Sequence, residues 1–352
     1  MSVCAVAFAS AMLGGCSSTS TSTVSQYVDD LAWLPDESGL LAYIDKVTIS
    51  SLDGSTIEGA NLYHVSSSGS IGNSINPSDE PINSLGYPPI VVVAPDGHSA
   101  ITPFSNDIYR VDLTGSGGVT DIIQNEGLIG VSRGSQYVSV TSVASSDATK
   151  LVTMYRLTGG TAQTPLNGGR PYTIVGVNSQ RFLWLDDAHF AATIYDSTGA
   201  GGIQFNHVTI FDTAANKLLD IPNAEVSLHA SAYAPKSGDL FVRNYASGID
   251  RIHLDWNNLL DTLRTSIVTG DTVASFDVSS DGTLLVYSSE ALSTNGNYPA
   301  YAVNVSNGHR SALASNVIAP VISPNADRVG YIEKADASGD ETVGVIAVTL
   351  PQ

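Results

Sequence analysis

A glycine-flanked serine is the first feature of the sequence that could do chemistry. Gly130, Ser132 and Gly134 have the spacing of a nucleophile elbow, in which a strained strand-to-helix turn pushes a serine hydroxyl into a cleft. No helical pattern follows Gly134, because residues 137–143 alternate as a strand does. We therefore expect a turn between two strands at Ser132, and we assign no catalytic residue.

Histidines and acidic residues are the other candidates, since they could bind a metal ion. No histidine pair has the His-x-His or His-Glu-x-x-His spacing that places ligands on one face. Residues 336–341 resemble a calcium loop superficially, but they lack the length and alternating ligands of an EF-hand. We predict a solvated hairpin tip there, and no metal or other cofactor. His98, His189 and His309 lie in or beside expected turns, and the other histidines are His64, His207, His229 and His253.

The acidic balance of the chain limits its partners. Fifteen Lys and Arg oppose 34 Asp and Glu, so the net charge is −19. Such a surface repels nucleic-acid phosphates and anionic headgroups, which argues against nucleic acid as a partner. It favours solubility, and it would also favour a basic protein or a cation.

The N-terminal residues differ in composition from the rest. Residues 2–13 are an apolar run that is too short to span a bilayer but has the length of a signal-peptide core. The run ends in Leu13-Gly14-Gly15-Cys16, which resembles the lipobox of bacterial lipoproteins. That resemblance implies a signal peptide at residues 1–15 and a lipid anchor on Cys16. The usual Lys or Arg ahead of the run is missing, which suggests that the true start lies upstream.

The lipoprotein resemblance also sets the expected location. The Ser/Thr tract after Cys16 predicts a polar tether at residues 16–23, which fits an anchor better than the alternative, a buried first strand. Cys4 would leave with the signal peptide, so the mature chain would hold no thiol pair for a disulfide or a zinc site. Because Ser17-Ser18 lacks the Asp that resembles an inner-membrane retention signal, we expect the outer membrane, facing the periplasm or the cell surface.

A repeated pattern organises the remainder of the chain. An apolar strand, a turn rich in Pro, Asp, Gly or Ser, and a second apolar strand recur along it, as repeat architectures require. In such turns Pro presets φ, Asp bonds its own backbone and Gly accepts a positive φ. The copies near residues 133 and 186 are the weakest, so six or eight copies are alternatives to seven. The turns lie near residues 35, 95, 133, 186, 235, 280 and 324.

Each repeat continues into a third and a fourth strand. Residues 107–112 and 120–123 follow the second copy in this way. Asn307-Gly308 is the strongest two-residue hairpin turn in the chain. Four antiparallel strands in a repeat are typical of a β-propeller blade. We therefore predict an all-β fold, a single propeller of seven four-stranded blades over residues 24–352.

The two ends of the chain predict how the ring closes. After the strand at residues 343–350 only two residues remain, so the last blade has three strands from the C-terminus. Residues 23–28 have the length of a strand, and we expect them to supply the missing outer strand, which would leave no long open edge. A β-sandwich and a β-helix are the alternative folds, but sandwiches rarely repeat one unit and β-helix periods are shorter.

Several other segments carry expectations. Trp33 and Trp184 occupy matching places before turns, so we expect both to pack between blades and not to stack on a sugar. Residues 256–263 are the nearest candidate for a helix. Long loops on a rigid scaffold are where binding residues tend to lie. The long polar inserts are residues 45–60, 72–89, 196–204 and 289–299.

The wording of the turns, as in Ala94-Pro95-Asp96-Gly97, resembles that of TolB-type propellers. The resemblance covers about residues 24–352 and implies the propeller fold, but it says little about function. Propeller lyases of similar type bind a metal in the central channel through histidines on separate blades. Histidine ligands dispersed along the chain are therefore an alternative to the absence of a metal.

These observations favour a binding protein over an enzyme. We predict a lipid-anchored propeller of the cell envelope that acts as a non-catalytic protein-interaction scaffold, whose loops and acidic face dock another envelope protein. The alternative is a glycan-binding or glycan-active propeller that uses the central channel, where Tyr, His and acidic side chains would converge. A purely structural envelope component is a third alternative.

Overall fold

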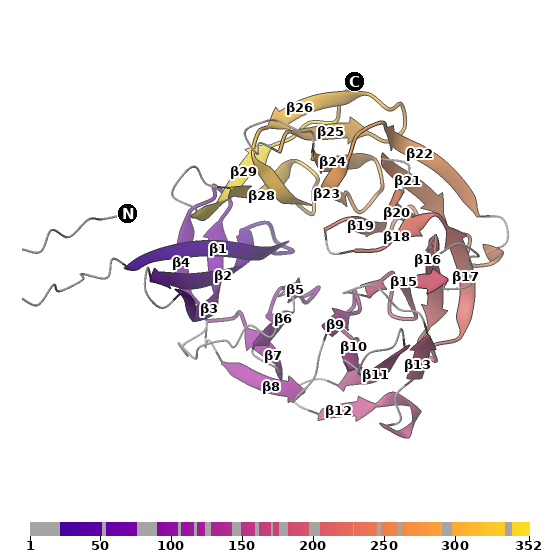
Figure 1. The fold of residues 1–352 in the computed structure, drawn as a ribbon, viewed down its shortest axis with the longest axis horizontal. Coiled ribbons are helices and arrows are strands. Elements are labelled where there is room, and N and C mark those ends of the chain that lie inside the picture. The colour runs from indigo at the N-terminus through magenta and orange to yellow at the C-terminus, as the bar shows by residue number, and fades with distance from the viewer. Residues whose placement is uncertain are drawn as a thin grey trace, which may run out of the picture.

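The structure is a seven-bladed β-propeller. It is a computed structural model that describes residues 22–50, 54–75, 90–104, 107–115, 118–123, 128–142, 149–158, 162–169, 172–175, 182–196, 205–227, 229–244, 248–259, 262–290, 298–334 and 340–352. Seven antiparallel sheets stand around a central axis in chain order (Figure 1), which confirms the predicted all-β fold. Across these residues the one regular helical element longer than a single residue is the 3-10 helix η1 (Leu166–Gly169), and no helix could cross a membrane.

The first three blades contain strands β1 to β13. Within each of these blades, strands that follow one another in the chain pair as neighbours, apart from β13, which pairs with β11. Their bounds are β1 (Ser22–Trp33), β2 (Gly39–Ser50), β3 (Gly54–Ser66) and β4 (Ile71–Ser74) in blade one; β5 (Val92–Val93), β6 (Ser99–Phe104), β7 (Asp107–Asp112) and β8 (Val119–Ile123) in blade two; and β9 (Leu128–Val131), β10 (Tyr137–Ser142), β11 (Thr149–Thr158), β12 (Ala162–Pro165) and β13 (Tyr172–Val175) in blade three.

The last four blades contain strands β14 to β29. In blade five, β18 and β19 both pair with β20. The bounds are β14 (Leu183–Trp184), β15 (His189–Asp196), β16 (Phe205–Asp212) and β17 (Lys217–Pro222) in blade four; β18 (Ala224–Glu225), β19 (Ser231–Ala234), β20 (Asp239–Asn244), β21 (Gly248–His253) and β22 (Leu263–Thr269) in blade five; β23 (Val273–Val278), β24 (Leu284–Ser289), β25 (Ala300–Asn304) and β26 (Arg310–Ala314) in blade six; and β27 (Val317–Ile322), β28 (Arg328–Lys334) and β29 (Glu341–Ala347) in blade seven.

All seven predicted turns are present, and each one joins the first hairpin of its blade, as the turn between β1 and β2 does in blade one. A backbone hydrogen bond closes each one, for example Leu34 N to Gly39 O at 3.0 Å and Ala94 N to Ser99 O at 2.8 Å. Because the seven blades repeat one topology, these turns gather on one face of the ring, which we call the turn face. The turn chemistry of the sequence therefore located this face correctly.

Trp33 and Trp184 pack between blades, as predicted. Trp33 Nε1 donates to Val321 O of blade seven at 2.9 Å, and Trp184 Nε1 donates to Ser139 Oγ of blade three at 3.1 Å. Each tryptophan thus bonds the blade that precedes its own around the ring, and both side chains are buried. A buried indole needs such an acceptor, since an unpaired N–H in an apolar core is costly.

The prediction that residues 23–28 complete the last blade is wrong. They belong to β1, the first strand of blade one, which pairs with β2 along its length, from Ser22↔Ser50 to Trp33↔Leu40. Blade seven contains only β27, β28 and β29. The local hairpin forms because a short turn joins its strands, so pairing them costs less chain entropy than pairing the two ends of the chain. The strand also begins at Ser22, inside the expected tether.

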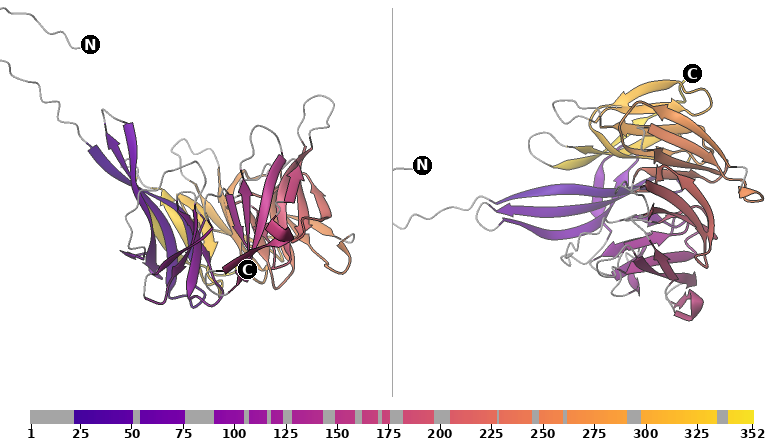
Figure 2. Two further views of the ribbon diagram at one scale, coloured as in Figure 1. Left: turned by 90° about the horizontal axis from the view of Figure 1, so that it is seen from below. Right: turned by 45° about the vertical axis from the view of Figure 1, so that its right-hand side comes forward.

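The expectation of a polar insert at residues 45–60 is also wrong, because most of it is strand. β2 and β3 continue as a hairpin to the pair Ser50↔Gly54, beside the first part of β1. Figure 2 shows these three strands projecting from the ring. We call residues 22–28, 45–50 and 54–60 the arm, and the face of the ring opposite the turn face the arm face.

Several expectations fall outside the described residues. They concern the signal peptide, Cys16, most of the tether, and most of the inserts expected at residues 72–89, 196–204 and 289–299. The described ends of those inserts include parts of β4, β15 and β24. The helix candidate at residues 256–263 is partly described: Trp256 and Asn257 form a turn, and Leu263 begins β22. The described part of that segment thus contains no α-helix.

Candidate functional site

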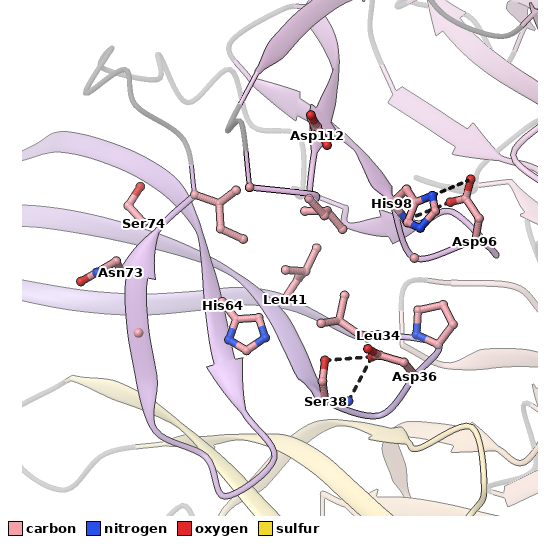
Figure 3. Close-up of a pocket in the computed structure, with 16 residues that line it drawn as sticks. Leu34, Asp36, Ser38, Leu41, His64, Asn73, Ser74, Asp96, His98 and Asp112 are labelled. Carbon is pink, nitrogen blue, oxygen red and sulfur yellow. Dashed lines mark hydrogen bonds and ion pairs between the residues drawn. The ribbon is translucent and has the colours of Figure 1, made fainter.

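A groove of about 930 Å³ lies on the turn face, between blades one and two. The turn at residues 34–38 forms one wall, and the turns at residues 94–98 and 112–115 form the other (Figure 3). Parts of β3 and β4 close its outer end. Gly97 has a φ of +71° and lies close to the ring of Pro35, so the two first turns meet at the inner end.

Three aspartates stand at the rim of this groove, and each begins the same local structure. Asp36 Oδ1 accepts from Ser38 N at 3.0 Å, and Asp96 Oδ1 accepts from His98 N at 2.9 Å. Asp112 Oδ1 accepts from the amide of the residue two places on, at 2.8 Å. This is the Asx turn, in which the side chain mimics the backbone of a β-turn. It fixes the direction of each carboxylate.

The floor of the groove is apolar. Leu34 and Leu41 from blade one face Leu113 from blade two, and Ile75 lies at the end of β4. Leu34 and Leu41 also belong to the core cluster between these blades, so the floor is held by packing. A rigid apolar floor with a few fixed polar groups is typical of a binding site.

The rim carries negative charge. Hydrogen bonds from the Ser38 amide and hydroxyl lower the pKa of Asp36, and nearby His64 lowers it further. Asp36 is therefore ionised at neutral pH. His64 and His98, both exposed, are the other titratable side chains of the groove besides the three aspartates. The groove can accept hydrogen bonds from a cationic group while it covers apolar surface.

Ser132 lies in the turn of blade three, as predicted. Its buried Oγ donates to Asp187 Oδ1 of blade four at 2.6 Å, and it accepts from the Gln136 and Tyr137 amides at 3.1 Å. Three groups thus bond one fully buried hydroxyl. This geometry closes the turn and joins two blades.

The described histidines do not gather into a cluster that could bind a metal ion. Across the described part of the chain, no group of three or more His, Cys, Asp or Glu could hold a metal ion. Five described histidines instead contact single aspartates: His189 with Asp186 at 2.9 Å, His253 with Asp239 at 2.9 Å, His207 with Asp220 at 3.7 Å, His229 with Asp30 at 3.7 Å and His98 with Asp96 at 3.9 Å.

Side chains also converge where the central channel opens on the turn face. A cavity of about 310 Å³ there is lined by residues of blades one, three, five, six and seven. The Arg133 guanidinium donates to Tyr233 O and lies 5.6 Å from the Tyr233 ring centroid. Burial raises the pKa of Asp277, which accepts from Ile322 N at 2.8 Å. Tyr233 and Trp33, the aromatic residues of this cavity, are buried, so neither offers an open face to a sugar.

The last two residues of the expected solvated tip at residues 336–341 contact another blade. Asp340 and Glu341 are its described residues, and both accept hydrogen bonds from backbone amides of β1. For these two residues the expectation is wrong, because they bind another blade and are partly buried. The contacts cross more than 300 residues of sequence, and no local pattern could have predicted them.

The sequence predicted the turns that line the groove, but it did not predict the groove itself. Asp36 and Asp96 were recognised as turn residues that bond their own backbone. What the sequence did not show is that adjacent blades bring these two turns together with Asp112. The available signal was the repeat itself, since equivalent turns of neighbouring blades must lie side by side.

Comparison with known proteins identifies the fold. No protein-family model matches the chain, and no curated protein matches it. Solved propellers do match. An oligogalacturonate lyase in complex with manganese has a TM-score of 0.58 and 13% identity, with 94% of this chain and 91% of that chain covered. The β-propeller domain of Cps50 (Swd1) from Myceliophteria thermophila has a TM-score of 0.56 and 9% identity, with 94% and 98% covered.

Two further solved structures are similar to this chain. A Pyrococcus horikoshii acylaminoacyl peptidase has a TM-score of 0.55 and 10% identity, and covers 92% of this chain and 52% of its own. TolB from Acinetobacter baumannii is a structural neighbour with a TM-score of 0.43 and 11% identity, covering 94% and 81%. At these identities the likeness shows the fold alone, because one fold hosts many functions. The TolB-type resemblance of the turns stays a prediction.

Proposed function

We propose that this protein is a non-catalytic interaction scaffold, and that the groove between blades one and two binds a basic, extended segment of a partner protein. The observation that supports this function is the arrangement of Asp36, Asp96 and Asp112. Three carboxylates, each fixed by an Asx turn, surround an apolar floor. Positively charged side chains with apolar stems match both features.

The chemistry of Lys and Arg fits the groove better than that of other side chains. Their methylene stems can cover Leu34, Leu41 and Leu113 while the charged heads reach the rim. Hydrogen bonds between a cation and a carboxylate are the stronger kind. The net charge of −19 would also attract a basic partner from a distance and raise its association rate.

Binding of a fluorescein-labelled peptide of alternating Arg and Leu tests the proposal. Fluorescence anisotropy would compare the wild type with D36N/D96N/D112N, in which Asn keeps the Asx acceptor and removes the charge. We expect the dissociation constant to rise by about tenfold, which corresponds to about 1.4 kcal/mol shared among the three lost charge contacts.

A matched control separates the groove from the overall charge. Asp212, Asp255 and Asp281 form the same Asx turns elsewhere, with acceptor distances of 2.8, 2.9 and 3.0 Å to the amide two residues on. D212N/D255N/D281N changes the net charge equally and should leave binding unchanged. Equal weakening by both triple variants would show that the peptide binds the acidic surface at large and not the groove.

The envelope location is part of the same proposal. The lipobox resemblance at Leu13-Gly14-Gly15-Cys16 supports a lipid anchor on Cys16, with the propeller held near the outer membrane and docked to another envelope protein. Cys16→Ser should move the protein from the membrane fraction to the soluble fraction of its source cells. Unchanged membrane association of that variant would contradict the anchor and leave the groove proposal standing.

A glycan ligand in the central channel is the second candidate. The observation that favours it is Arg133 at the channel mouth, beside Asp277 and several serines. Arg133→Ala would then abolish binding of an acidic oligosaccharide while peptide binding in the groove continues. Equal binding of that oligosaccharide by the variant and the wild type would contradict this function.

A further inference from the structure

Blades seven and one meet along a seam that closes the ring. At the turn-face end, Trp33 Nε1 donates to Val321 O, and the Arg328 guanidinium pairs with Glu37 at 3.2 Å. A shared apolar cluster fills the middle of the seam, with Val28 and Leu31 from β1 among its buried members. These contacts carry no pair of like charges.

The arm-face end of the seam is held differently. No strand ladder joins β1 to β29; instead carboxylate side chains bind the free edge of β1. Asp340 Oδ1 accepts from Gln26 N, and Glu341 Oε2 accepts from Val28 N, both at 3.0 Å. Gln26 Nε2 also donates to the Glu341 carbonyl at 3.1 Å. Two acidic side chains therefore replace a β-ladder at this end.

A pair of carboxyl groups lies directly beside these contacts. Asp29 occupies the bulge between Val28 and Asp30, where β1 shifts register against β2. Asp45 on β2 is its neighbour, and both carboxyl groups line one cavity of about 320 Å³. One buried oxygen of each, Asp29 Oδ2 and Asp45 Oδ1, has no hydrogen-bond partner among the described residues. A carboxylate has no donor, so the two groups can hydrogen-bond each other only while one of them holds a proton.

The groups that face the pair come from three strands and one loop. Glu341 faces it from β29, Asp30 from β1 and Tyr43 from β2, while His229 lines the same cavity of about 320 Å³. Asp30 contacts His229 at 3.7 Å and accepts from Val91 N at 2.7 Å, so it stays engaged with blades five and two. Asp340 and the exposed Lys46 are the next charges along the strands.

These surroundings favour the protonated pair. Burial raises the pKa of Asp29 to about 8, and the neighbouring charges of Asp45, Glu341 and Asp30 add to the effect. Burial also raises the pKa of Asp45. Buried groups and like charges oppose ionisation in this way because the charged form loses hydration and meets repulsion.

We propose that Asp29 and Asp45 form a proton-dependent latch at the arm-face end of the seam. While the pair holds a proton, β1 keeps the shape in which Gln26 and Val28 meet Asp340 and Glu341. When the proton leaves, two negative charges stand beside Glu341, and β1 separates from β29 at this end. The turn-face end stays closed, since its Arg328–Glu37 pair and Trp33 bond do not depend on this proton.

The latch goes beyond the proposed scaffold function, because the groove lies on the opposite face and shares none of these groups. Its effect would be to release the edge of β1 and the base of the arm as the pH rises above about 8. An exposed strand edge can pair with another strand. The latch would therefore make one edge of the ring available at alkaline pH only.

Hydrogen exchange of the full chain at about pH 6 and about pH 9 tests the latch. Exchange rates are corrected for their intrinsic pH dependence, and β24 in blade six serves as the internal reference. We expect protection of β1 and β29 at the seam to fall by about tenfold relative to β24 between the two conditions, as loss of one linked proton predicts. Asp29→Asn, which cannot ionise, should abolish that fall.

Two more variants make the outcome unambiguous. Asp45→Asn removes the neighbouring charge that adds to the raised pKa of Asp29, so it should reduce the fall, and it decides the question if Asp29→Asn does not fold. Glu37→Gln weakens the turn-face end of the same seam and should keep the pH dependence. The latch is overturned if wild-type protection at the seam follows β24 at both values of pH, or if folded Asp29→Asn or Asp45→Asn keeps the full fall.

Discussion

The exposed turns of the turn face and the seam at the arm face both carry aspartates, but they act on the carboxylate in opposite ways. On the turn face, hydrogen bonds from Ser38 lower the pKa of Asp36, which is fully exposed to water. On the arm face, burial and neighbouring carboxylates raise the pKa of Asp29 to about 8. The same side chain is therefore a fixed negative charge in one place and a proton carrier in the other.

The difference follows from the repeat. Asp36 occupies a turn position that recurs in other blades, as Asp96 and Asp281 show, and each accepts from the amide two residues on. Asp29 occurs once, at a bulge where the first blade meets the last. An aspartate at a repeated turn position accepts a hydrogen bond from the backbone two residues on. An aspartate at the seam between the first and last blades instead has side chains from the far end of the chain as neighbours. We expect polar groups to stabilise the protein on the turn face and to destabilise it at the latch.

The largest expected effect is the loss of a satisfied turn-face hydroxyl. Ser132→Ala removes the donor to Asp187 and the acceptor of two backbone amides, all in a buried site. Leaving such groups unpaired should lower the free energy of unfolding by about 2 kcal/mol. Urea denaturation at neutral pH measures it. Ser68→Ala, in an exposed turn, is the control and should change the stability by less than about 0.5 kcal/mol.

Asp29→Asn should raise the free energy of unfolding, whereas Ser132→Ala lowers it. The unfolded chain loses the Asp29 proton near its ordinary pKa of about 4, whereas the folded chain keeps it to about 8. Between these values the unfolded state binds fewer protons, so wild-type stability falls as the pH rises. The variant removes this fall, so it should be more stable than the wild type at about pH 8 and almost equally stable at about pH 4. Urea titrations at both values that show one constant difference would contradict the raised pKa.

The fold was largely predictable because the repeat is local. Each turn and its hairpin depend on residues a few positions apart, and all seven turns were located from the sequence. Trp33 and Trp184 could be assigned to packing because the repeat gave them equivalent places. Ring closure was predicted wrongly, because it depends on a choice between two partners for β1. The pattern of residues 23–28 suits either partner, and only the short turn to β2 favours the local one.

The candidate sites were less predictable because they lie between blades. The groove needs Asp36 and Asp112 from different sheets, and the latch needs Asp29 beside Glu341, residues more than 300 positions apart. Alternation along one strand does not show which neighbouring side chain lies beside it in the ring. The sequence therefore located individual aspartates in turns but could not distinguish a rim carboxylate from one that holds a proton.

The smallest expected effect completes the comparison with a single turn-face carboxylate. Hydrogen bonds from Ser279 and Thr283 lower the pKa of Asp281, so its folded pKa lies below the unfolded one. The stability that it adds is present above about pH 4 and is lost as the pH falls through the folded pKa. Asp281→Ala should thus cost about 1 kcal/mol at neutral pH, from the lost hydrogen bonds, and less in acid. Urea denaturation at about pH 7 and about pH 3 measures the cost under each condition. A cost that grows in acid would mean that Asp281 behaves as Asp29 does and that the two faces do not differ.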